Sequence, residues 1–460
     1  MTSRPPLDVT TGPIFPAAFK LAWPILMSML MEFTLAITNV FWVGQLGPRQ
    51  QDAMTSATIV MWSLFAAMSL VTIGVNAFVS QNVGARDPLR AGFVAKRGLM
   101  LAAMCGVLFG ALGFISAPAL LQFMEAEEQV AVYGVEFLRI FFLGAPLLTV
   151  LETLSAVFRA TGDSRTPMLV SVVTVVCNLI LDPLLIFGVG PFPEMGVSGA
   201  ALGTCFSLAL GLLLYWYLSP RRLSIPLRSE GVDPWRVSGE IIRLGAPIAT
   251  HQMTFILVYW FIIQVVHHFG FVAGAALGIG NRLEAINYLL SSALAVAAST
   301  IVGQNIGANN PDRAERAAWV TVGLGALITG AISIVFLVIP GQLADIFTNE
   351  SAVRVAASRY IVIVGLSQIF MALEIIIDGA FAGAGNTLPP MIISIPGAII
   401  RIPLASYLAI DRGLGIDGVW WTISLTCMAK GVILAIWFKR GRWKRQSLVA
   451  HPHNFSAPAN

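Results

Sequence analysis

Charged residues are scarce in this 460-residue chain, because Asp, Glu, Lys and Arg together make up only 11% of it. A soluble globular domain carries about 25% charged residues, so the ordinary soluble classes are excluded. Hydrophobic residues make up 57% of the chain, and its mean hydropathy is +0.79. The composition therefore indicates a membrane protein.

Cysteine pairs, nucleotide-binding loops and long polar segments are also missing. The four cysteines have no Cys-x-x-Cys spacing, which argues against a disulfide framework or a zinc site. No Gly-x-x-x-x-Gly-Lys-[Ser/Thr] loop occurs, and no His-Glu-x-x-His or Asp-rich metal motif lies in the apolar segments. We therefore expect neither an enzyme nor a bound cofactor nor an associated ATPase subunit. An ion gradient is the simplest remaining source of energy.

An internal repeat relates the two halves of the chain. Residues 81–90, Gln-Asn-Val-Gly-Ala-Arg-Asp-Pro-Leu-Arg, return at 304–313 as Gln-Asn-Ile-Gly-Ala-Asn-Asn-Pro-Asp-Arg. The offset between these two blocks also pairs Pro24 with Pro247, Gly47 with Gly270, and Gly162 with Gly385. One register held over most of each half indicates a duplication. Two related halves in a bilayer are typical of secondary transporters.

Apolar stretches long enough to span a membrane, which takes roughly 20 residues, occur six times in each half. The expected spans are 18–43, 53–79, 93–118, 131–158, 167–190, 196–219, 239–268, 271–302, 316–340, 354–382, 388–410 and 415–439. We therefore predict an all-α polytopic membrane protein with twelve transmembrane helices in two six-helix, pseudo-symmetric bundles. The predicted parts are an N-terminal segment 1–17, an N-lobe 18–219, an inter-lobe loop 220–238, a C-lobe 239–440 and a C-terminal tail 441–460.

Lysine and arginine gather in alternate loops, which predicts the orientation of the chain. Short loops rich in Lys and Arg stay in the cytoplasm, so both termini and the inter-lobe loop are predicted cytoplasmic, in the inner (cytoplasmic) membrane of the cell. The net charge of +4 comes from these loops and not from one basic stripe. No nucleic-acid partner is therefore expected. We expect a monomer surrounded by the lipid bilayer.

Several polar residues interrupt the predicted spans of the first half. A charge at the bilayer centre costs at least about 2.5–3.5 kcal/mol and persists mainly where it faces a cavity or a partner. Asn178 and Asp182 are four residues apart and share a helix face beside Pro183. A carboxylate, an amide oxygen and freed carbonyls can bind a proton or Na⁺. Glu32 and Asn39, seven residues apart, share another face.

The second half has acidic residues of its own. Glu374 and Asp378 repeat the four-residue spacing, and Glu284 lies in an earlier span. Some of the intramembrane charges are alternatively explained as ion pairs that hold helices together. The pairs considered are Arg139 with Glu136 or Glu152, and Arg401 with Asp378.

Four motifs together resemble a known family. They are Asn-Val-Phe-Trp-Val-Gly-Gln-Leu-Gly at 39–47, Arg-Ala-Thr-Gly-Asp-Ser-Arg-Thr-Pro-Met at 159–168, Asn-Leu-Ile-Leu-Asp-Pro-Leu-Leu-Ile-Phe-Gly at 178–188 and Gly-Val-Ser-Gly-Ala-Ala-Leu-Gly-Thr at 196–204. With the paired Gln-Asn blocks they resemble prokaryotic members of the multidrug and toxic compound extrusion (MATE) family of the MOP superfamily, over residues 15–440. The resemblance implies a V-shaped twelve-helix antiporter that exports lipophilic, often cationic, drugs and xenobiotics in exchange for H⁺ or Na⁺ by alternating access.

The resemblance also implies a coupling site. Asn178 and Asp182 match the N-lobe cation site of the DinF-type branch, and Thr204 falls on a polar site residue of its sixth span. Asn39 stands where the family usually has Asp, and we hypothesise that Glu32 supplies the missing charge. Pro24 is predicted to be the hinge of the first span, since an internal proline bends a helix.

A C-lobe site remains the alternative location for coupling. The NorM-type branch places a carboxylate in its seventh span, where this chain has Phe255. Coupling then runs either through Asp182, which matches the family in identity and spacing and is favoured, or through the acidic cluster of Glu374, Asp378 and Glu284.

The alternative function is that of a lipid-linked oligosaccharide flippase of the same superfamily. Such a protein needs cations that hold a pyrophosphate. The intramembrane candidates are Arg139, Arg282, Arg401 and Lys430.

Overall fold

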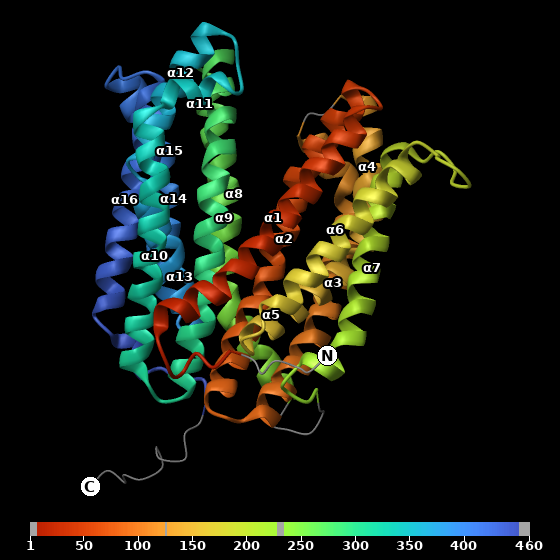
Figure 1. Cartoon of the computed structure of the whole chain (residues 1–460). Helices are drawn as coiled ribbons and strands as arrows, with labels where there is room; N and C mark the ends of the chain where they lie inside the picture. Colours follow the sequence, from red (N-terminus) through yellow and green to blue (C-terminus); the bar gives the residue numbers. More distant parts are fainter. Residues whose placement is uncertain (1–6, 125–126, 228–233, 450–460) are drawn as a thin grey trace. The chain divides into compact units, whose positions relative to one another are not determined.

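The computed structural model describes residues 7–124, 127–227 and 234–449. Every regular element in this part of the chain is a helix (Figure 1), which confirms the predicted all-α class. The predicted N-terminal segment, inter-lobe loop and C-terminal tail lie partly outside the described residues, at 1–6, 228–233 and 450–460.

The chain packs into two compact units. The first contains the described residues of Met1–Asp8 and of Trp23–Ala249. Its helices are most of α1 (Ile14–Gly44), α2 (Pro48–Gly84), α3 (Pro88–Phe123), α4 (Glu128–Leu143), α5 (Ala145–Ala160), α6 (Arg165–Ile186), α7 (Gly196–Arg222) and the first part of α8 (Pro234–His267).

The second unit contains Val9–Ala22 and the described residues of Thr250–Asn460. Its helices are the remainder of α8, α9 (Phe271–Gly307), α10 (Pro311–Val338), α11 (Pro340–Asp345), α12 (Ser351–Gly365), α13 (Gln368–Gly383), α14 (Leu388–Ile399), α15 (Arg401–Ser406), a π-helical turn (Tyr407–Asp411), α16 (Ile416–Lys439) and a 3₁₀ turn (Arg442–Arg445). The first part of α1 thus belongs to the second unit by packing, and the lobe boundaries expected from the sequence stay a prediction.

The described helices account for the twelve expected spans. Ten are long and apolar enough to cross a membrane. One of these ten, Leu388–Asp411, combines α14, α15 and the π-helical turn. Two bent pairs supply the others: α4 with α5 at 52°, and α12 with α13 at 51°. The count of twelve agrees with the prediction when each bent pair is one span.

The bends have local causes that differ between the two pairs. Pro146 occupies the first turn of α5 and has no N–H to continue the hydrogen bonds of α4. Between α12 and α13 the chain has no proline. There the Ser333 hydroxyl donates to the carbonyl of Gly365, which satisfies an acceptor freed by the break.

The repeated Gln-Asn blocks form the same turn in both units. The helices before the blocks end at Gly84 and Gly307, and those after them begin with a proline. Arg86 and Asn309, which the repeat pairs with each other, both have φ of 58°, and no other described non-glycine residue has a positive φ. A matching left-handed turn at matching positions is structural evidence for the duplication.

The second block also binds the start of the chain within the second unit. The Asn305 amide donates to the carbonyl of Val9 at 3.1 Å. The Arg313 guanidinium donates to the carbonyls of Thr11 at 2.8 Å and Gly12 at 2.9 Å. These bonds hold the segment that leads into α1.

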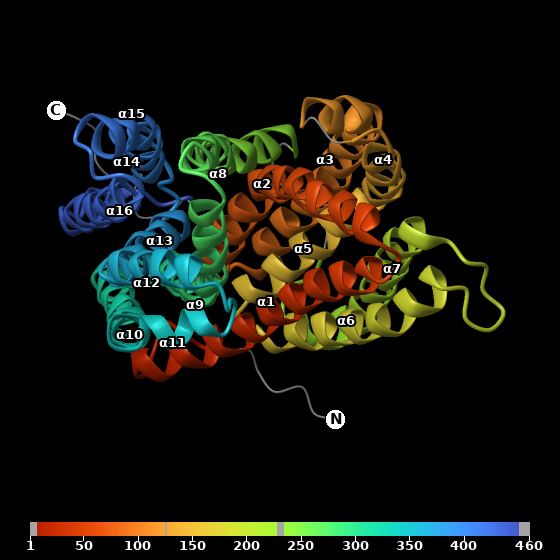
Figure 2. The ribbon, with the colours of Figure 1, turned by 90° about the horizontal axis from the view of Figure 1, so that it is seen from above.

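Close approach of α6 and α7, which lie side by side in Figure 2, depends on small residues of α7. A Cβ atom added to Gly199 would lie 2.5 Å from the carbonyl oxygen of Leu185. The α13–α9 pair of the second unit uses the same device, since a Cβ on Gly383 would lie 2.1 Å from the carbonyl oxygen of Ser299. Glycine therefore sets these helix separations.

We expect Gly199→Ala to destabilise the purified protein by about 1–3 kcal/mol, because the new methyl group forces α6 and α7 apart. Gly323→Ala in α10 is the matched control, since no atom lies within 4 Å of its added Cβ. Thermal unfolding in detergent measures both variants. Equal melting temperatures for the two would show that the close approach does not limit stability.

Candidate functional site

Four of the predicted site residues meet inside the first unit. Asn39 comes from α1, Asn178 and Asp182 from α6, and Thr204 from α7. Asn178 and Asp182 are completely buried, and the other two are each 6% exposed. The four-residue spacing on α6 places its two members on one face, toward the other helices.

Hydrogen bonds join the four side chains. The Asn178 amide donates to Asp182 Oδ1 at 2.9 Å and lies 3.5 Å from Thr204 Oγ1. The Asn39 amide donates to the same threonine hydroxyl at 3.3 Å. Thr204 in turn donates to the carbonyl of Ala200 at 3.0 Å. Its hydroxyl is therefore the atom through which α1 is linked to α6.

Three buried oxygens of this cluster have no hydrogen-bond partner among the described residues: Asn39 Oδ1, Asn178 Oδ1 and Asp182 Oδ2. A buried acceptor without a donor costs about 1–3 kcal/mol, more when it is charged. Carboxylate and amide oxygens are ligands for hard cations such as Na⁺, and a carboxylate also takes a proton. The donor set therefore has the chemistry to bind H⁺ or Na⁺, and its role in coupling stays a prediction.

Gly203 is part of the same site, although the sequence did not single it out. A Cβ atom there would lie 2.6 Å from Asp182 Oδ1 and 3.6 Å from Asn178 Nδ2. The missing side chain makes room for the carboxylate against α7. The signal was present in the Gly-rich start of that helix, but glycines in a span also serve simple packing.

Glu32 lies apart from this cluster. Its side chain is exposed, and the charges that act on it are those of Glu152 and Arg159 in α5. Asp182 is not among them. That Glu32 supplies the missing charge stays a prediction, now without a contact to support it.

Pro24 lies inside α1, as expected for a hinge. The Ser28 hydroxyl donates to its carbonyl at 3.1 Å. The hinge role itself stays a prediction.

The second unit arranges its acidic residues differently. The Lys430 ammonium lies 2.5 Å from Glu374 Oε1, and the two side chains are only 7% and 8% exposed. The Ser394 hydroxyl donates to the same oxygen at 3.3 Å. Asp378 lies within electrostatic range of the pair, and its Oδ1 has no hydrogen-bond partner among the described residues. One of the two predicted carboxylates is thus neutralised by a lysine.

Glu284, the third member of the predicted C-lobe cluster, belongs to a separate network. Its Oε2 accepts from the Tyr360 hydroxyl at 2.6 Å, and its Oε1 accepts from the Gln368 amide at 3.0 Å. Gln368 also accepts from Asn287 at 2.6 Å. The three acidic residues therefore do not form one cluster of hydrogen-bonded carboxylates.

The ion pairs considered from the sequence do not form. Within the described residues, neither Arg139 nor Arg401 makes an ion pair with a carboxylate. Arg139 instead lies over the ring of Phe114 at 5.3 Å, and Arg282 over that of Phe347 at 5.9 Å. Ring faces stabilise these two guanidinium groups, of Arg139 and Arg282, in place of carboxylates.

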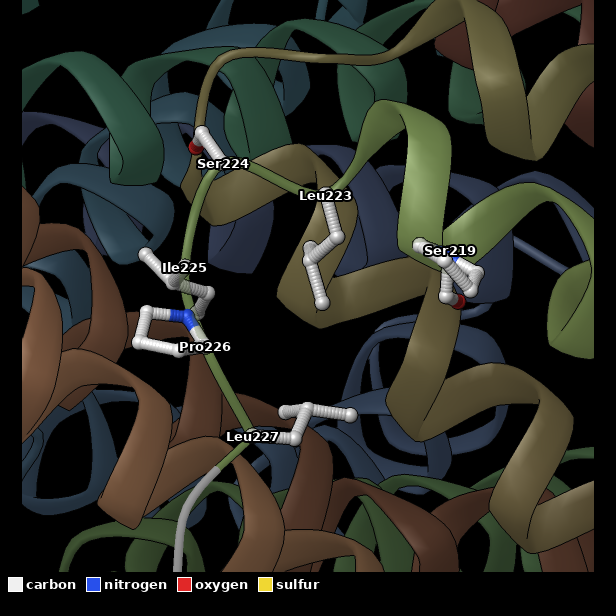
Figure 3. A pocket seen from close by; sticks show the side chains of 7 residues that line it. Ser219, Leu223, Ser224, Ile225, Pro226 and Leu227 are labelled. Carbon is white, nitrogen blue, oxygen red and sulfur yellow. The ribbon is translucent and has the colours of Figure 1, made fainter.

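A hollow of about 430 Å³ at the end of α7 has no charged residue in its lining (Figure 3). Its lining residues are Ser219, Pro220, Leu223, Ser224, Ile225, Pro226 and Leu227. None is charged, so the hollow is not a cation site.

Two related helical units with polar sites inside their apolar bundles are typical of membrane transporters. The family model named MatE matches residues 24–184 and again residues 247–407, with the same offset at both ends as between the Gln-Asn blocks. The chain belongs to the MatE family, whose members are transporters and not enzymes. The double match is also independent evidence for the internal repeat.

Two relatives with the same sequence identity to this chain differ in their named functions. A probable multidrug resistance protein NorM from Thermotoga maritima is 27% identical over 435 residues, which cover 94% of this chain and 93% of that protein. An FAD transporter from Shewanella oneidensis is 27% identical over 433 residues, 93% of this chain and 92% of that protein.

The fold has a close match among solved structures. A MOP superfamily transporter from Pyrococcus furiosus gives a TM-score of 0.89 at 21% identity, covering 97% of this chain and all of that one. Similarity at this identity establishes the shared fold.

We expect Lys430→Met to destabilise the protein by about 3–5 kcal/mol, because it leaves Glu374 buried without its partner. The double variant Lys430→Met/Glu374→Gln removes both charges and should recover most of that loss. Thermal unfolding of the purified variants tests this. A double variant no more stable than the single one would mean that the lysine acts through its packing and not through the pair.

Proposed function

We propose that this chain exports small lipophilic compounds, including cationic drugs and xenobiotics, in exchange for H⁺ or Na⁺ that binds at Asp182. The observation that carries the proposal is the buried cluster of Asp182, Asn178, Thr204 and Asn39, with three oxygens lacking hydrogen-bond partners among the described residues. Membership of a transporter family and a multidrug resistance relative support it. We also propose that the chain resides in the cytoplasmic membrane with both termini in the cytoplasm.

The contacts favour Asp182 over the acidic residues of the second unit as the coupling group. Glu374 already has a cation, Lys430, at 2.5 Å, and an external ion would have to compete with it. Both oxygens of Glu284 accept hydrogen bonds from neutral donors. Among the described residues Asp182 accepts one such bond, and its second oxygen has no partner there and can receive an ion.

Ion binding at Asp182 would act on α1 through the shared threonine. The Asn39 amide reaches Thr204 at 3.3 Å, and Asn178 reaches the same hydroxyl at 3.5 Å. A cation that draws the Asn178 and Asn39 oxygens toward itself holds both amides in place and tightens these weak bonds to Thr204. We propose that α1 then bends at Pro24 and alters the substrate site.

The flippase alternative finds less support. A pyrophosphate needs several convergent cations, yet Lys430 is paired with Glu374, and Arg139 and Arg282 lie over aromatic rings. Only Arg401 among the four candidates keeps a guanidinium without an ion pair or a ring in the described part of the chain.

Asp182→Asn should abolish gradient-driven export of a cationic dye from liposomes that contain the purified protein. The substitution keeps the shape of the side chain and removes its ability to bind a proton or to neutralise Na⁺. A pH gradient and a sodium gradient, imposed separately, identify the ion that drives wild-type export.

Asp378→Asn is the matched control for this experiment, being the same change at a buried aspartate of the second unit. It should retain coupled export. Loss of coupling in Asp378→Asn together with intact coupling in Asp182→Asn would place the ion site in the second unit instead.

Thr204→Val should raise the ion concentration that gives half-maximal export by about fivefold. Valine has nearly the shape of threonine but lacks the acceptor for Asn39 and Asn178, and one net hydrogen bond contributes about 1 kcal/mol. Thr204→Ser keeps the hydroxyl and should behave like the wild type. Equal behaviour of the valine and serine variants would remove Thr204 from the site.

A further inference from the structure

One buried arginine of the second unit has no acidic partner among the described residues. Arg401 begins α15 and is 8% exposed. Its Nε donates to Thr426 Oγ1 at 2.8 Å, which is its only hydrogen bond within the described residues. Both terminal nitrogens, each with two N–H groups, therefore remain without an acceptor in this part of the chain. A guanidinium in this state inside a membrane protein indicates a function.

The neighbouring carboxylates are already engaged. Glu284 acts on Arg401 electrostatically, but both its oxygens accept from Tyr360 and Gln368. Glu374 is bound by Lys430. Glu284 thus offsets part of the arginine charge without accepting a hydrogen bond from it, and Glu374 is occupied by the lysine.

The internal repeat relates Arg401 to a residue of the candidate cation site in the first unit. Its offset, valid over both matches to the family model, relates Asn178 to Arg401 and Asp182 to Ala405. An amide and a carboxylate in the first unit thus become a guanidinium and a methyl group in the second. The first arrangement offers oxygens to a cation, and the second offers N–H groups to an anion.

We propose that Arg401 binds an anionic group of the substrate, a carboxylate or a phosphate, through its two terminal nitrogens. Guanidinium is suited to this task because its planar fork matches the two oxygens of such a group. One arginine fits one such group. The proposal rests on the proposed export function and extends its substrate class to lipophilic compounds that carry an acidic group.

An aromatic surface for the lipophilic part lies on α8 of the same unit. The charge of Arg401 acts on His251 of this helix, and Phe255 and Tyr259 follow His251 at four-residue intervals on the same helix face. Their rings stack at 6.1 Å, and Phe255 is 43% exposed. We propose that this aromatic surface receives the lipophilic part of the ligand.

Two dyes that differ in one group test this proposal: rhodamine 6G, an ethyl ester, and its free acid. Fluorescence anisotropy of each dye with the purified full-length protein in detergent, without any gradient, gives the dissociation constants. Arg401→Gln should weaken binding of the acid at least tenfold and that of the ester less than twofold. Arg401→Lys keeps the charge without the fork and should give an intermediate loss for the acid.

Arg282→Gln is the matched control, because it removes another intramembrane arginine of the same unit and should leave both dyes unaffected. Equal weakening of acid and ester in Arg401→Gln would indicate a structural role and overturn the proposal. So would unchanged binding of the acid in that variant, or failure of the wild type to bind the acid.

The proposed function has a separate readout, so the two failures can be told apart. Export of the ester by wild-type protein in liposomes under a gradient tests ion-coupled transport without involving the acidic group. If the ester is not exported, ion-coupled transport fails, while the comparison of acid and ester binding still decides the role of Arg401.

Discussion

A polar atom in hydrocarbon has to find its partner inside the protein, and this constraint governs the whole structure. The helices satisfy their own backbone groups, so the exceptions are side chains and helix breaks. At the break before α13 a serine hydroxyl meets a freed carbonyl. In the second unit Lys430 meets Glu374. The cluster around Asp182 stands out because three of its oxygens have no such partner among the described residues.

The duplication shows how two copies of one scaffold can diverge in chemistry while they keep their geometry. The turns at Arg86 and Asn309 have the same φ, and both units pack helices through glycines that face backbone carbonyls. The polar residues of the Asp182 site follow no such symmetry. Position for position, Asp182 corresponds to Ala405, and Asn178 to Arg401. Backbone geometry is thus common to the two copies, and the charge at each site is particular to one of them.

Periodic and repeated features were predictable from the sequence. The constant offset between the halves appears in the family match, the twelve apolar stretches appear as helices, and the Asn178–Asp182 spacing produces a hydrogen bond. Each depends on residues near in sequence or on a long run with one property. Local rules of this kind are visible without a structure.

Contacts between distant spans were not predictable in the same way. Lys430 and Glu374 lie in different spans, and the sequence of neither span indicates that the two side chains form a pair. The same holds for Gly203, whose role depends on which helix lies against it. Glu32 shares a helix face with Asn39 but is two turns away, and its electrostatic neighbours come from α5. Tertiary packing decides these cases.

One set of hydrogen bonds affects folding during synthesis: those from Asn305 and Arg313 to Val9, Thr11 and Gly12. The chain emerges from the ribosome at about 5–20 residues per second, so these partners follow the N-terminal segment by roughly 15–60 s. During that interval the entry to α1 lacks these hydrogen-bond partners. The segment that leads into α1 therefore reaches its final packing only after the second half has been synthesised, whereas the rest of α1 packs within the first unit.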